Sequence, residues 1–521
     1  MNIRYVIKQL GLLLIVLSVA ILTVAIWSLW QGYAYQLQSQ SDAGFALLTT
    51  VSISVSIGLI CYLAGKRGDD YLGKKEALLL VALAWIIGAA ISAMPYYLWA
   101  NLNPMPLDPV NGPHPFTHWA HCYFESMSGL TTTGATVLSE IQSLPHGILM
   151  WRSTTHWLGG LGIVVLFVAV LPSLGVGGKK LFQIEAPGPS QPGVRPRIRE
   201  TARILWLIYL GMTLAQTALL RYFGMNTFDA INHTFATLAT GGFSTKNASA
   251  GYFTNPSILI VLICFMVMAG MNFGLFYLLI KRKFKAFWKD PELRLYLIIL
   301  LAATTLITCS IYNQDIVLTN EQTLKNPSAG QTFLQAAFQV VSIQTTTGFC
   351  TADYQDWGFI SKATLIIIMF IGGSAGSTGG GIKVIRILIL AKVLLAEIEK
   401  VFRPNVVRPV KIGRAAIDSA TKLSTLIYAI NIVLIFIIGA IALMIAEQYC
   451  GGKPIDFTSA ATASAATLNN IGPGLNLVGA TKNYGWFSQP SLAIMSLLMA
   501  LGRLEIYALL VLFSPHFWKS E

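Results

Sequence analysis

The sequence predicts an all-α polytopic membrane protein, in which four helix–loop–helix repeats follow two additional N-terminal helices. The first observation is composition: 54% of the 521 residues are hydrophobic and only 11% are charged. A soluble domain carries roughly twice that charged fraction. The second observation is a short phrase that occurs four times along the chain, which indicates that one structural unit is used four times.

The apolar residues are gathered into ten runs, each long enough, at about 20 residues, to cross a bilayer as a helix. The predicted crossings are 9–31, 43–64, 77–100, 151–175, 202–223, 256–280, 293–312, 361–395, 421–448 and 490–513. The last eight form pairs around the four copies of the phrase. The predicted units are therefore the N-terminal helices at 1–76 and the repeats at 77–200, 201–292, 293–415 and 416–521.

Basic residues lie in alternate connections between these crossings. The connections after crossings two, four, six and eight are rich in lysine and arginine, whereas residues 32–42 and 101–149 contain neither. This pattern places the basic connections and both termini in the cytoplasm. The net charge of +13 is therefore mainly a topology signal and does not indicate nucleic-acid binding. A share of it is available for anionic membrane lipid or a cytoplasmic partner.

Each copy of the phrase follows a short amphipathic run and contains one glycine that aligns with the others. These glycines are Gly134, Gly242, Gly348 and Gly472, at steps of 108, 106 and 124 residues. A short helix is expected before each loop, at 119–128, 228–236, 333–341 and 457–466. Four such loops in a membrane have the arrangement of an ion-selectivity filter, so the repeat is a helix–pore-loop–helix unit of the kind found in potassium channels.

The four phrases supply the oxygen atoms that a dehydrated cation needs. Backbone carbonyls and threonine hydroxyls replace water without adding net charge, and glycine lets the backbone turn its carbonyls inward. Each short helix directs the negative end of its macrodipole at the loop. The absence of a carboxylate ring argues against a filter selective for divalent cations. Among monovalent cations, carbonyl-rich loops suit the larger, less hydrated potassium better than sodium. The predicted ion-binding residues are Thr132, Thr133, Gly134, Thr240, Gly241, Gly242, Thr346, Thr347, Gly348, Asn470, Ile471 and Gly472.

Crossing eight contains six glycines within ten residues. Such a stretch does not form a regular helix, because each glycine costs about 1 kcal/mol relative to alanine. Unwound backbone at membrane depth is tolerated where it is buried in protein or lines water. We therefore predict an internal loop below the filter that acts as a gate, with a tight packing kink as the alternative. The loop consists of Gly372, Gly373, Ser374, Ala375, Gly376, Ser377, Thr378, Gly379, Gly380 and Gly381.

Three further polar residues lie in membrane or pore segments. Arg503 in crossing ten is costly to bury. It either projects into the pore as a fixed cation, as part of the gate, or forms a salt bridge with Glu505 or another buried acid. Glu125 and His233 lie on the first two short helices, and we expect them to be structural partners of nearby polar groups. The alternatives are direct ion binding for Glu125 and a proton relay for His233.

The sequence predicts no enzymatic activity. Gly372 to Gly376 matches the G-x-S-x-G pattern of hydrolases, but no strand precedes it. The chain has no Walker-type lysine phrase and no G-x-G-x-x-G pattern, so we expect no nucleotide site and no cofactor on it.

The loop phrases resemble those of the Trk/Ktr/HKT superfamily of potassium transporters. The resemblance is carried by residues 128–136, 239–245, 347–349 and 466–474, and the glycine-rich break, Arg503 and the two extra helices are similar to the TrkH-type branch. It implies potassium uptake across the bacterial inner membrane by a homodimer with one pore per protomer. It also implies that the glycine-rich break is the gate and Arg503 a second constriction.

The resemblance further implies a cytosolic partner, a TrkA-type ring whose domains bind nucleotide, so that nucleotide is bound by the partner alone. Potassium is then the substrate, bound as a metal ion at the filter. A gated, channel-like pore is the main hypothesis, and a proton-coupled potassium symporter is the alternative. A symporter needs a titratable relay at the bilayer midplane, where Glu505 is the one candidate among acids and histidines.

Overall fold

The computed structural model describes residues 1–66, 73–102, 114–160, 162, 198–404, 409–413, 415–451 and 454–519. These residues are predominantly helical, so the predicted all-α class is confirmed. Two short antiparallel strand pairs lie between helices. β1 (Ile316–Val317) pairs with β2 (Thr323–Leu324), with Ile316 opposite Leu324, and β3 (Lys411–Ile412) pairs with β4 (Ala415–Ala416), with Lys411 opposite Ala416.

Six helices in the described part of the chain are long and apolar enough to cross a membrane. They are α1 (Ile3–Tyr35), α2 (Gln38–Gly65), α3 (Lys74–Leu102), α8 (Ile198–Tyr222), α13 (Pro291–Ser310) and α17 (Ser419–Cys450). The remaining predicted crossings contain shorter helices, which are α5 (His146–Gly160), α10 (Pro256–Ala269), α11 (Phe273–Ile280), α15 (Phe359–Ile371), α16 (Val384–Phe402), α19 (Gln489–Arg503) and α20 (Tyr507–Leu510). The second part of predicted crossing four, at 161 and 163–175, lies outside the described residues.

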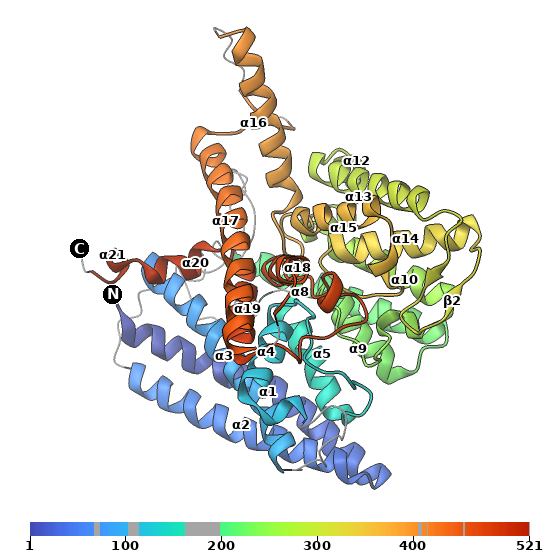
Figure 1. The fold of residues 1–521 in the computed structure, drawn as a ribbon. Helices are drawn as coiled ribbons and strands as arrows, with labels where there is room; N and C mark the ends of the chain where they lie inside the picture. The colour runs from blue at the N-terminus through green and yellow to red at the C-terminus, as the bar shows by residue number, and fades with distance from the viewer. Residues whose placement is uncertain are drawn as a thin grey trace.

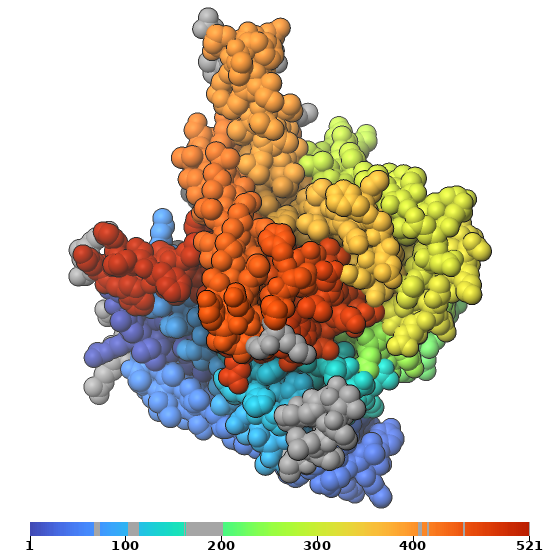
Figure 2. All heavy atoms as spheres, in the orientation of Figure 1, coloured from blue at the N-terminus to red at the C-terminus, as the bar shows by residue number. Residues whose placement is uncertain are grey.

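Four short helices precede the four repeated phrases, close to the predicted positions. They are α4 (Trp119–Leu130), α9 (Thr227–Leu238), α14 (Ala329–Gln344) and α18 (Phe457–Leu468). The C-terminal part of each is buried, as at Leu130, Leu238, Ile343 and Leu468. Two further short α-helices, α12 (Phe284–Trp288) and α21 (Pro515–Trp518), complete the α-helices of the described residues. Figure 1 shows α18 near the centre of the molecule and α16 projecting from it, and Figure 2 shows the same projection as a column of side chains.

The N-terminal helices α1 and α2 form a tight antiparallel hairpin at one edge of the molecule (Figure 1). The chain reverses at Gln36, which has the left-handed φ of 53° that ends α1. Gly11 and Gly58 allow the two backbones to touch, since a Cβ on either would overlap the carbonyl oxygen of the other. Such small-residue contacts are typical of membrane helix pairs.

Both chain ends lie beside the start of α3 (Figure 1). The Asn2 backbone N–H donates to Glu76 Oε1 at 2.9 Å, and Lys75 Nζ donates to the Lys519 carbonyl oxygen at 3.2 Å. The two termini are therefore on the same side of the molecule, which is a requirement of the predicted topology.

Crossings six and ten are interrupted, as crossing eight is. The prediction that crossings six and ten are each one unbroken helix is therefore wrong. The α10–α11 pair bends by 97° and the pair that begins with α19 and continues at Tyr507 bends by 115°. Asn272 explains the first bend, because its side chain caps α11 by accepting from the Gly274 N–H at 2.8 Å. At the second bend, Glu505 and Ile506 both adopt positive φ.

Candidate functional site

Three of the four short helices begin at capping side chains. Asn226 accepts from the Asp229 N–H, Asp456 accepts from the Ser459 N–H, and Ser328 forms a reciprocal capping box with Gln331. These side chains satisfy N–H groups that a helix leaves unpaired at its first turn. They fix where each helix starts, and hence where its C-terminus lies.

All four short helices end in the same backbone motif. After each helix one residue adopts a positive φ, and the next N–H reaches back five residues to a carbonyl oxygen in the last turn. In α4, for example, Thr132 has φ 54° and the Thr133 N–H donates to Ser128 at 2.8 Å. The positive-φ residues are Thr132, Thr240, Thr346 and Asn470. This is the Schellman motif, which normally uses glycine.

Threonine at a positive φ is a strained choice, since it is β-branched. Strained residues of this kind persist where the surrounding structure fixes them, and they gather at functional sites. The three threonines are 1% exposed or less, so the strain lies within a packed interior. In the sequence, only the alignment of the four phrases with one another could have identified these positions.

The four aligned glycines join the loops into a closed ring. Each has a positive φ, between 77° and 96°. A Cβ on any of them would overlap a carbonyl oxygen of another loop: Gly134 faces Gly241, Gly242 faces Thr347, Gly348 faces Ile471 and Gly472 faces Thr133. The contacts thus run through the loops in chain order and return from the fourth to the first.

The same four glycines line one cavity of about 140 Å³. The structure therefore brings together four segments that are separated by more than 100 residues each. The loops also interlock through side chains, because Asn470 Nδ2 donates to Thr133 Oγ1 at 3.0 Å. Within loops one and three, paired threonine hydroxyls lie 2.8 Å apart, at Thr131–Thr133 and Thr345–Thr347.

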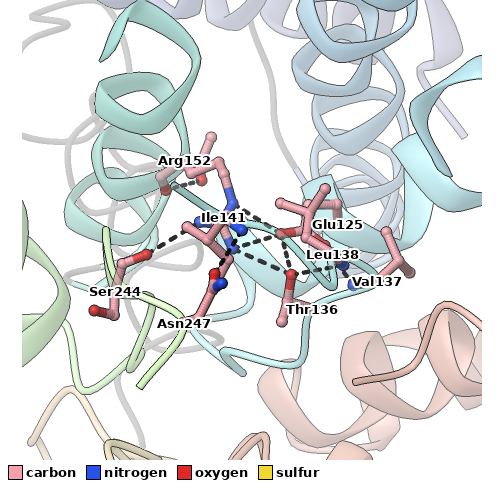
Figure 3. Close-up of polar contacts among 9 residues, drawn as sticks. Glu125, Thr136, Val137, Leu138, Ile141, Arg152, Ser244 and Asn247 are labelled. Carbon is pink, nitrogen blue, oxygen red and sulfur yellow. Dashed lines mark hydrogen bonds and ion pairs between the residues drawn. The ribbon is translucent and has the colours of Figure 1, made fainter. Parts of the chain in front are cut away.

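A buried ion pair supports the ring behind loops one and two (Figure 3). Arg152 on α5 and Glu125 on α4 lie 2.7 Å apart, and their side chains are 1% and 0% exposed. The Glu125 carboxylate also accepts from Thr136 Oγ1 and from the Val137 N–H, both at 2.9 Å. Arg152 reaches loop two through the Ser244 carbonyl oxygen at 3.3 Å. Glu125 is therefore the structural partner that the sequence analysis expects.

His233 on α9 has a comparable structural role. Its Nδ1 lies 2.8 Å from the Asp229 carbonyl oxygen and its Nε2 lies 3.0 Å from Ser244 Oγ. Ser244 belongs to the segment that follows loop two, so His233 connects this segment to its own helix.

The glycine-rich loop lies against the ends of three short helices. Thr378 Oγ1 donates to the Leu238 carbonyl oxygen of α9 at 2.9 Å, and the Gly380 N–H donates to Thr346 Oγ1 at 2.8 Å. A Cβ on Gly380 would overlap the Asn469 carbonyl oxygen that follows α18. The segment contains no regular helix between α15 and α16, as the sequence predicts.

Arg503 joins this loop to the end of α5. Its Nη1 donates to the Thr378 carbonyl oxygen at 2.6 Å, and its Nη2 donates to the Gly160 carbonyl oxygen at 2.9 Å and to that of Gly159. Glu505 forms an ion pair with Arg386 at 2.6 Å, so the structure does not support the alternative in which Glu505 is the salt-bridge partner of Arg503. Arg503 therefore places a positive charge beside the loop.

A family model described as TrkH, cation transport protein, matches residues 108–520. The chain belongs to the TrkH family. The Trk system potassium uptake protein TrkH of Salmonella typhimurium is 38% identical over 522 residues, which cover all of both chains. TrkG of Escherichia coli, also named a Trk system potassium uptake protein, is 33% identical, with 91% of this chain and 92% of TrkG covered.

The crystal structure of the potassium transporter TrkH from Vibrio parahaemolyticus has the same fold, with a TM-score of 0.82 and 34% identity over the whole of both chains. Membership of the TrkH family and the apolar helices make this chain an integral membrane protein. The family is one of transport proteins and not of enzymes.

Removing Glu125 is expected to destabilise the TrkH fold strongly. The Glu125→Ala variant leaves Arg152 buried and unpaired, which costs about 3–5 kcal/mol of unfolding free energy. The matched control is Glu397→Ala, which breaks the exposed Glu397–Lys400 pair and should cost less than about 1 kcal/mol. Denaturant unfolding of both variants in detergent measures the two losses. Equal losses would contradict a structural role for the Glu125–Arg152 pair.

Proposed function

We propose that this chain takes up potassium through a pore at the ring of four loops. The observation that carries the proposal is the closed contact between the aligned glycines and the carbonyl oxygens of neighbouring loops. The TrkH-family relatives named above are potassium uptake proteins, which supports the same substrate.

The proposed filter works by replacing the hydration shell of the ion. Four helix C-termini direct partial negative charge at the ring, and backbone carbonyls and threonine hydroxyls supply oxygen ligands. The ion-binding residues are those of the four phrases, from Thr132–Gly134, Thr240–Gly242, Thr346–Gly348 and Asn470–Gly472. Because these ligands carry no formal charge, the site favours a monovalent cation.

The proposed gate is the loop 372–381 together with Arg503. Its contacts with the end of α9, with Thr346 after α14 and with Asn469 after α18 support a gate position next to the ring. In this position it obstructs the path that an ion would take from the filter. Flow then requires the loop to move, so the pore behaves as a gated channel.

The proposed setting is the bacterial inner membrane, with both termini in the cytoplasm. The two termini share one side of the molecule, which supports their lying in one compartment, and the basic connections support the cytoplasm as that compartment. A homodimer and a cytosolic TrkA-type ring that binds nucleotide complete the proposed assembly. Helix α16, which projects from the rest of the molecule (Figure 2), is the candidate surface for such a ring.

Expression of the chain is expected to restore growth at low potassium to a bacterial strain that lacks its own potassium uptake systems. The same strain carrying an empty vector is the control, and membrane content of the protein is measured in parallel. Failure to restore growth, with the protein present in the membrane together with a TrkA-type partner, would contradict the proposed function.

A further inference from the structure

We propose that Glu292 is a positioning residue that holds the gate loop shut, an inference that rests on the function proposed above. Glu292 is the second residue of α13, and only 7% of its surface is exposed. A carboxylate buried at that position is costly unless strong hydrogen bonds compensate for the lost water. The structure shows where those bonds go.

A single oxygen of Glu292 binds both the gate loop and the helix that follows it. Glu292 Oε1 accepts from the Ala375 N–H at 2.6 Å and from the Ile385 N–H at 3.1 Å. Ala375 lies within the loop, and Ile385 lies in the first turn of α16. The loop cannot leave the filter with α13 in place unless these bonds break.

The segment that carries Glu292 is attached to the loop at its other end as well. This segment, residues 273–294, begins at the bend of crossing six, where the Phe273 N–H donates to the Gly376 carbonyl oxygen at 3.0 Å. Between its two attachments it exposes basic side chains, which are Lys281, Arg282, Lys283, Lys285 and Lys289. A displacement of segment 273–294 is therefore transmitted directly to the gate.

The Glu292→Ala variant is expected to raise potassium flux into sealed vesicles about tenfold in the absence of any partner, as a loss of about 1.4 kcal/mol from the closed state would do. The ratio of potassium to sodium flux should not change, because the filter is untouched. Glu292→Gln keeps an oxygen acceptor for both N–H groups and should return flux close to the original value.

A matched control is Glu447→Ala. Glu447 is 1% exposed, and its Oε1 likewise accepts two bonds, from the Ser488 N–H at 3.0 Å and from Ser488 Oγ at 2.7 Å. These bonds hold the start of α19 and make no contact with the gate loop. This variant should lower thermal stability without raising flux. It therefore separates the loss of a buried acid from the loss of the Glu292 bonds to Ala375 and Ile385, which we call the latch.

The flux measurements distinguish failure of the latch proposal from failure of the proposed potassium uptake. If the unaltered chain conducts potassium and Glu292→Ala does not raise its flux, the latch is overturned and the function stands. If the unaltered chain conducts no potassium with or without a TrkA-type partner, the proposed function itself fails.

Hydrogen exchange tests the latch even if the alanine variant does not fold. In the unaltered chain, the Ala375 and Ile385 amides should exchange slowly when the pore is shut and faster when a partner opens it. Rapid exchange of both amides in the shut state would overturn the proposal.

Discussion

Gly348→Ser is expected to reduce the ratio of potassium to sodium flux by roughly tenfold or more, the change that about 1.4 kcal/mol of lost discrimination produces. Gly348 has φ 80°, a conformation that a non-glycine residue adopts at a cost of about 1–2 kcal/mol. The new Cβ would also overlap the Ile471 carbonyl oxygen. The overlap must move loop four outward, and with it one of the oxygens proposed to bind the ion.

Two other glycines provide controls for this variant. Gly224 has φ 100° and open space around it, so Gly224→Ser introduces backbone strain without an overlap. Gly330, in the first turn of α14, also has open space where a Cβ would lie, so Gly330→Ser is the second control. Both control variants should keep the original flux ratio. A ratio that is unchanged in Gly348→Ser, or lowered equally in Gly224→Ser, would count against the ring as the selective element.

Arg503→Ala is expected to raise potassium flux about tenfold in vesicles without a partner, with little change in selectivity. The substitution removes a positive charge from beside the gate loop and releases the Thr378 carbonyl oxygen from its 2.6 Å hydrogen bond. A shift of about 1.4 kcal/mol toward the open state is sufficient for that change. Flux at several potassium concentrations measures it.

Arg221→Ala provides the comparison for Arg503→Ala, because Arg221 is an exposed arginine in the last turn of α8. Its removal tests for a general effect of lost positive charge. If Arg503→Ala leaves flux unaltered, or lowers it with the protein folded, Arg503 does not restrict the pore.

Much of the fold follows from patterns that the chain repeats. The aligned glycines and the amphipathic runs before them predict four short helices within a few residues of their observed bounds, as at α4 and α18. Apolar run length predicts the positions of the crossings because a bilayer sets the length of a helix. The glycine-rich break at 372–381 is visible in the sequence because its composition is incompatible with a helix.

The bends in crossings six and ten were not predictable on the same grounds. Each depends on one or two residues, such as Asn272 and Ile506, whose cost in a helix is small until tertiary contacts select the bent form. The partners of charged residues are likewise not predictable from the sequence, because tertiary contacts determine them. The Glu125–Arg152 pair and the bonds of Glu292 to Ala375 and Ile385 join segments whose proximity exists only in the fold.

The most direct test is ion flux into sealed vesicles that contain the purified protein and a TrkA-type partner. Potassium, rubidium or sodium is supplied outside, with either a membrane voltage or a pH gradient as the driving force. We predict that voltage alone drives potassium uptake, that sodium uptake is slower, and that no proton movement accompanies either. Uptake that requires a pH gradient would contradict the gated-channel account and favour the proton-coupled symporter.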